Sequence, residues 1–182
     1  DGFVRTASKH FVFLMAKEDE ASISAYAPKL AEEAYQQLTQ RYGFIPEGPI
    51  QIEVYPDHGG FAVRTLGLPG LGALGVCFGN VVAIDSPRAR SAGTFNWGST
   101  LWHELAHVIT LQTTRLNIPR WYSEGLSVYE EHRARPGWGD ALSPAFIKAY
   151  KEGKLLKVSE LNAGMMRPAF PEQIGLSYYQ AS

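Results

Sequence analysis

The sequence predicts an α+β fold with a small β-sheet. Alternating and β-branched segments occur in the first half of the chain, around one long amphipathic helix. From Ser99 onward the apolar residues recur only at helical intervals, and strands followed by helices are typical of α+β domains. The chain has 182 residues, of which 45% are hydrophobic, so it can bury one sizeable core. We therefore expect a single domain over residues 1–182.

The first elements are a strand, a helix and a second strand. Residues 9–17 (KHFVFLMAK) are rich in Phe and Val and predict the first strand. From Asp19 to Tyr42 apolar residues recur every three or four positions, which predicts an amphipathic helix, and Gly43 is a natural stop. Residues 49–56 (PIQIEVYP) alternate apolar and polar side chains and predict the second strand.

A loop and a hairpin are expected next. Residues 66–75 (LGLPGLGALG) are rich in Gly and Pro and predict a loop. Residues 75–87 (GVCFGNVVAIDSP) predict two strands that turn at Gly79 and Asn80.

The second half is predicted to be helical. One helix is expected from Ser99 to about Asn117, with Asn96 or Ser99 as its N-cap. Pro119 opens a second helix at its first position, through residues 120–133. Shorter helices are expected within 143–153, where Ser143 is the cap, and within 171–182.

The composition excludes several kinds of partner and site. The net charge of −1, with no run of like charges, gives no basic face for nucleic acid. No apolar run approaches the length of a membrane span. The single cysteine, Cys77, excludes an internal disulfide framework and a cysteine-based zinc site, and it leaves the compartment open. The chain starts without Met or a signal-peptide core, so we expect a processed part of a longer protein with further covalently linked domains.

The stretch HELAH at 103–107 carries the strongest chemical signal. His103 and His107 are four residues apart, so on a helix both imidazoles can reach one ion. Glu104 points about 100° away from His103, which suits a general base beside a metal-bound water. The alternative is two core histidines and a solvated Glu. The window LWHELAHVI is apolar almost all round, and buried imidazoles and a buried carboxylate need partners, which favours the metal site.

A third ligand is predicted on the next helix. A short connection joins the two helices, so they are expected to pack antiparallel and to bring Glu124 within reach of the imidazoles. Two His and one Glu with an open position make a catalytic zinc site, with one Zn²⁺ per chain. The alternative for Glu124 is a first-turn carboxylate favoured by the helix dipole.

HELAH followed by W-x-x-E-G, here Trp121, Glu124 and Gly125, resembles the gluzincin zinc metallopeptidases, especially the peptidase MA-like group. The resemblance covers most of the chain and implies a zincin-like fold, in which a small mixed sheet precedes the HExxH helix and a glutamate helix. It implies zinc held by His103, His107 and Glu124, and Glu104 as base and proton shuttle. It also implies that the strand beginning Gly75, Val76, Cys77 binds an extended peptide or protein substrate.

The resemblance further implies a tyrosine that stabilises the oxyanion, for which Tyr178 and Tyr179 are the candidates. His132 is a third candidate, although an ordinary helix-end histidine is the more natural interpretation. Glu131 falls seven residues after Glu124 and is either a partner for a ligand His or a solvated Glu. Related gluzincins continue into further helices, so we expect this chain to be truncated after its last helix.

Two departures from the family matter for the activity. Only 16 residues separate His107 from Glu124, so the connection is tighter than in aminopeptidase N-like enzymes. The Gly-x-Met-Glu-Asn motif of those enzymes is absent, and GALGV at 72–76 has no carboxylate to hold a free amine, which favours internal cleavage. The sequence thus predicts a zinc endopeptidase. The alternative is a weak or inactive peptidase-like module that binds metal or peptide.

Overall fold

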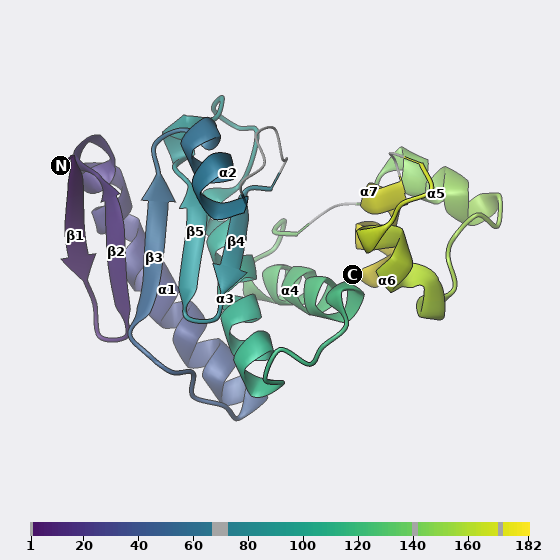
Figure 1. The fold of residues 1–182 in the computed structure, drawn as a ribbon, viewed down its shortest axis with the longest axis horizontal. Helices are drawn as coiled ribbons and strands as arrows, with labels where there is room; N and C mark the ends of the chain where they lie inside the picture. Colours follow the sequence, from purple (N-terminus) through teal and green to yellow (C-terminus); the bar gives the residue numbers. More distant parts are fainter. Residues whose placement is uncertain (1, 67–72, 140–141, 171–172) are drawn as a thin grey trace. The chain divides into compact units, whose positions relative to one another are not determined.

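A computed structural model describes residues 2–66, 73–139, 142–170 and 173–182 (Figure 1). The chain divides into two compact units, Asp1–Arg115 and Leu116–Ser182, and each is described by itself. None of the described helices has the length and apolar character that would let it cross a membrane.

The first unit contains a mixed sheet, which the described residues build from five strands in the order β1-β2-β3-β5-β4. Neighbours β2 and β3 are parallel, as are β3 and β5, whereas β1/β2 and β4/β5 are antiparallel. The predicted α+β class with a small mixed sheet is therefore confirmed. The strands are β1 Phe3–Ala7, β2 Phe11–Ala16, β3 Ile50–Tyr55, β4 Gly75–Phe78 and β5 Val81–Asp85.

Helices cover both faces of this sheet. In Figure 1, α1 (Glu20–Tyr42) and α3 (Trp97–Thr113) lie behind it, and α2 (His58–Leu66) lies in front. The alternation of β3 explains the two layers, because Ile52 and its same-face neighbours are buried toward one side, while Tyr55 packs with Phe61 of α2 on the other. Two short 3-10 turns, η1 (Lys17–Asp19) and η2 (Pro87–Ala89), complete this unit.

The ends of the two long helices follow their sequence signals. Gly43 closes α1 in the left-handed conformation, with φ of 61°, and its N–H donates to the Thr39 carbonyl. The Asn96 side chain caps α3 by accepting a hydrogen bond from the Ser99 N–H. Asn96, and not Ser99, is thus the N-cap.

The second unit is helical in its described part. Its helices are α4 (Arg120–Ala134), α5 (Pro144–Lys151), α6 (Val158–Met166) and α7 (Gln173–Ala181). Close packing depends on glycine. A Cβ on Gly125 would collide with the Ala181 carbonyl, and one on Gly164 would lie 2.5 Å from the Ser177 hydroxyl oxygen. The Gly of W-x-x-E-G is therefore what lets α7 approach α4.

Several element predictions were wrong or incomplete. Three elements were not expected: β1, which is short and largely exposed; α2, whose two glycines suggest a turn; and α6. Helix α3 ends at Thr113, before Asn117, because Arg115 and Leu116 adopt positive φ. Pro119 is the N-cap of α4 and not its first residue. Of the predicted loop at 66–75, residues 67–72 lie outside the described residues, as do 171–172 of the last predicted helix.

Candidate metal and catalytic site

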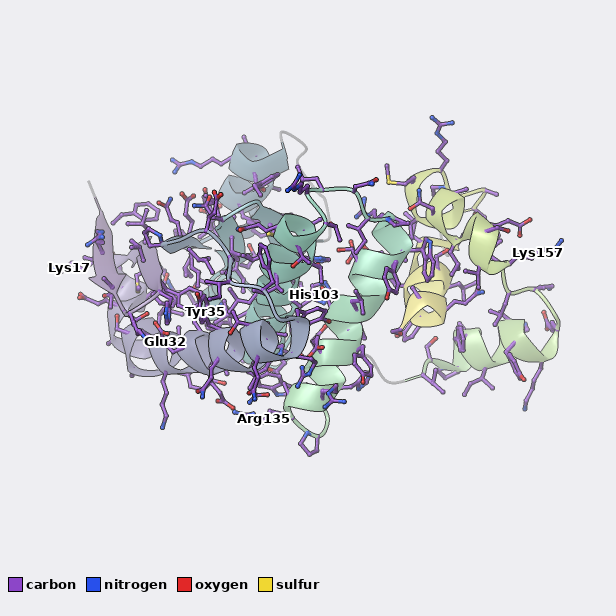
Figure 2. All side chains as sticks on the ribbon, turned by 90° about the horizontal axis from the view of Figure 1, so that it is seen from below. Lys17, Glu32, Tyr35, His103, Arg135 and Lys157 are labelled. Carbon is purple, nitrogen blue, oxygen red and sulfur yellow. The ribbon has the colours of Figure 1, made fainter. Side chains whose placement is uncertain are left out.

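Helix α3 carries the two predicted imidazole ligands. His103 and His107 occupy successive turns, with ring centroids 4.8 Å apart and ring planes at 77° (His103 is labelled in Figure 2). Both residues are half-buried, while their helix neighbours Trp102 and Ala106 are fully buried. The helix is thus anchored by its apolar residues, and the two imidazoles lie side by side, as the four-residue spacing predicts.

Glu104, the predicted base, lies against the edge strand β4. It is only 5% exposed. A Cβ placed on Gly75 would lie 2.7 Å from both Cγ and Oε1 of Glu104. Burial raises the pKa of the Cys77 thiol, and the charge of Glu104 raises this pKa further. Gly75 and Cys77 therefore share the face of β4 that meets Glu104, whereas Val76 packs with the cluster around Phe61 on the other face.

The hydrogen-bond register of β4 decides which peptide groups point away from β5. The Asp85 N–H donates to the Leu74 carbonyl, and Gly75 lies opposite Ile84. Hydrogen-bonded and non-hydrogen-bonded pairs alternate along an antiparallel ladder. Gly75 and Cys77 therefore direct their main-chain N–H and C=O groups away from β5, at the edge of the sheet.

In the second unit, Glu124 stands one turn into α4 beside Arg120. The Glu124 side chain is 12% exposed, and its Oε1 accepts a hydrogen bond of 3.3 Å from the Arg120 Nε. A terminal nitrogen of the same guanidinium donates to the Tyr178 hydroxyl oxygen at 3.2 Å. One guanidinium thus holds a carboxylate from α4 and a phenol from α7 next to each other.

The three candidates for the oxyanion donor differ in position. Burial raises the pKa of Tyr178, and Glu124 raises it further by charge and a hydrogen bond, against the opposing effect of Arg120. Tyr179 instead packs against Phe146, with the two ring centroids 6.0 Å apart. His132 is exposed and lies so close to Gly139 that a Cβ there would be 2.7 Å from the His132 Nε2. Of these candidates, Tyr178 is the one in contact with the surroundings of Glu124.

Two residues of α4 add to the sequence interpretation. Glu131 is buried, which argues against a solvated Glu, and Glu130 beside it is fully buried and was not predicted. Arg120 was also missed, although its position four residues before Glu124 is the usual spacing for a helical ion pair and could have revealed it.

Comparison of the chain with protein-family models, with curated proteins and with solved structures gives no match.

Proposed function

We propose that this protein is a zinc-dependent peptidase of the gluzincin type with a zincin-like fold. The observation that carries the proposal is the arrangement on α3, which holds two imidazoles side by side and, next to His103 in the chain, a buried carboxylate that lies against an edge strand. His103, His107 and Glu124 can each offer one ligand atom to the ion. Two imidazoles and one carboxylate match the ligand preference of catalytic zinc.

The donor chemistry fits zinc better than calcium or magnesium. Those ions prefer a cage of oxygen ligands, whereas imidazole nitrogen suits zinc and other transition metals. The buried state of Glu104 agrees with this interpretation, since a carboxylate removed from water is costly unless a positive charge or hydrogen bonds compensate it.

Each residue then has a role in hydrolysis. His103, His107 and Glu124 would hold the zinc, which would supply a water of lowered pKa, about 7, and polarisation of the scissile carbonyl. Glu104 accepts a proton from the attacking water and later delivers it to the leaving amine. The Tyr178 hydroxyl donates a hydrogen bond to the oxyanion, with Arg120 holding the phenol in position.

The substrate proposed for this site is an extended peptide. The outward main-chain groups of Gly75 and Cys77 can pair with such a peptide as an added strand, next to the base. Because residues 72–76 contain no carboxylate to hold a free amine, internal cleavage is favoured over removal of N-terminal residues.

Metal analysis and a peptide-library digest of the purified protein and its Glu104→Gln variant test this function. We expect about one zinc per chain in both proteins, and hydrolysis in the wild type that falls by at least about 10²-fold in the variant, since Gln cannot accept the proton. Glu152→Gln, which changes the C-cap residue of α5, is the matched control, and this variant should cleave peptides at the wild-type rate. Zinc binding without hydrolysis by the wild type would favour a metal-binding module instead.

A further inference from the structure

Gly75, the first residue of the edge strand β4, lies against the side chain of the predicted base Glu104. An added Cβ would lie 2.7 Å from the Glu104 Cγ and Oε1 and 2.9 Å from its Cδ. Ordinary contact begins at 3.4 Å, so an alanine would require the carboxylate to shift by about 0.7 Å. No other described glycine meets the Glu104 side chain.

The backbone itself would accept an alanine at this position. Gly75 is not among the residues with positive φ, and it lies in a regular antiparallel pair opposite Ile84. The three atoms nearest to the added Cβ all belong to Glu104, so the substitution acts first on that side chain.

We propose that Gly75 is a positioning residue of the peptidase reaction. Because Gly75 has no side chain, the Glu104 side chain can occupy the space next to β4 and keep the position from which it acts. This inference rests on the function proposed above. The main-chain groups of Gly75 also point outward at the edge of the sheet. The same residue can therefore bind the substrate backbone and leave room for the base. A misplacement of about 1 Å in a catalytic group can cost about 10²-fold in rate.

The proposal predicts a split between kinetic constants. In Gly75→Ala the main-chain groups that pair with the peptide are unchanged, so KM should stay within about twofold, while kcat falls about 10²-fold. Zinc content should stay at the wild-type level. Gly2→Ala is the matched control, because no atom lies within 4 Å of its added Cβ, and it should behave as the wild type.

A double-mutant cycle separates positioning from general damage. Glu104→Ala removes the Cγ, Cδ and Oε1 atoms that the methyl group added at position 75 would meet, so Gly75→Ala should destabilise the fold much less in that background. This cycle is followed by thermal unfolding of chelator-treated protein, so it needs no activity. There Gly75→Ala should lower Tm by a few degrees, and by less when it is combined with Glu104→Ala.

Two results would overturn the inference while leaving the peptidase in place. One is an active Gly75→Ala protein with wild-type kcat. The other is an equal loss of Tm from Gly75→Ala in the wild-type and Glu104→Ala backgrounds, which would mean that the methyl group disturbs the strand and not the base. If the wild type neither binds zinc nor cleaves peptides, the proposed function itself fails, and the role of Gly75 fails with it.

Discussion

The two units differ in how they hold their candidate residues. In Asp1–Arg115 the side chains of Phe11, Phe13 and Trp102 are almost completely buried in a large core between the sheet and its helices. In the described part of Leu116–Ser182 the buried apolar side chains are few: Val128, Ala149, Leu161 and Met165. The second unit also exposes several large apolar side chains, namely Leu116, Tyr122, Tyr129, Leu142, Ile147, Tyr150, Val158, Met166, Phe170 and Ile174.

In the second unit, hydrogen bonds help to hold the helices together, whereas in the first unit the apolar core holds the elements together. Besides Glu124 and Tyr178, Arg120 engages α6, because its main-chain N–H donates to the Asn162 side chain. The Gln180 side chain similarly brackets Leu156, accepting from its N–H and donating to its carbonyl. The predicted base and imidazoles therefore stand on a well-packed helix, whereas Glu124 and Tyr178 depend on hydrogen bonds between helices that bury few apolar side chains.

The largest effect expected from this comparison is on stability. Phe13→Ala should lower the free energy of unfolding by about 3 to 5 kcal/mol, because it empties a fully buried site in the first core. Ile147→Ala, at a 41% exposed site in the second unit, should change it by less than about 0.5 kcal/mol. Urea unfolding followed by circular dichroism measures both. Equal losses would show that α5 is packed as firmly as the sheet.

Tyr178 tests whether a polar network can orient a catalytic group. On the proposed function, Tyr178→Phe should reduce kcat by about 10² to 10³, since one oxyanion donor is lost, while zinc content is kept. Tyr179→Phe is the matched control on the next residue, and it should have little effect because Tyr179 packs against Phe146. An unchanged rate in a variant that carries both changes would mean that the donor lies elsewhere, with His132 next to examine.

Glu124 tests whether the second unit contributes to metal binding at all. Glu124→Ala should weaken zinc binding by more than about 100-fold, beyond the loss usual for residues that only support a ligand. Asn162→Ala, which removes a contact of Arg120 but no proposed ligand, should bind zinc as the wild type does. Competition with a chromophoric chelator gives both affinities. Stoichiometric, equally tight zinc in Glu124→Ala would remove Glu124 from the ligand set.

The sequence predicted helix ends correctly where a single local signal, such as a capping residue, decides the structure. The Gly43 stop, the Asn96 cap and the Ser143 cap, whose hydroxyl accepts from the Phe146 N–H, follow from short-range chemistry and were predicted. Helix α2 was missed because its stability comes from burying Phe61 on the sheet, although its own glycines disfavour a helix.

In the candidate site too, the features set by local sequence were predicted, and those set by contacts between distant segments were not. The spacing of His103 and His107 follows from helical geometry alone and was predicted from the sequence. The contact between Gly75 and Glu104 and the preference for Tyr178 over Tyr179 depend on which faces of distant segments meet. Nothing local in the chain encodes such a meeting, so only the folded structure distinguishes these residues.

The smallest expected effect concerns the hydrogen bonds of Glu32, which tie the turn between β1 and β2 to α1. Glu32 accepts hydrogen bonds from the Ser8 hydroxyl at 2.6 Å and the His10 main-chain N–H at 2.8 Å. Its other oxygen lies 2.6 Å from the His10 Nδ1, and the His10 ring stacks on Tyr35 at 3.9 Å (Glu32 and Tyr35 are labelled in Figure 2). The first unit thus also uses a polar contact, at its surface.

Acid should remove the contribution of this contact. Burial by itself would raise the pKa of Glu32, but the hydrogen bonds from Ser8 and His10 and the charge of His10 outweigh it, so the pKa lies below the ordinary 4.5. A carboxyl whose pKa is lower in the folded state stabilises the fold above its unfolded pKa, and this contribution disappears as the pH falls below 4.5 through the folded pKa. At pH 7, Glu32→Gln should therefore cost about 1 kcal/mol, and the cost should shrink in acid. Urea unfolding of chelator-treated protein at pH 7 and at pH 3.5 measures this difference, with Glu20→Gln, an exposed change on the same helix, as the control. A cost that is the same at both pH values would show that the negative charge of Glu32 contributes nothing to stability.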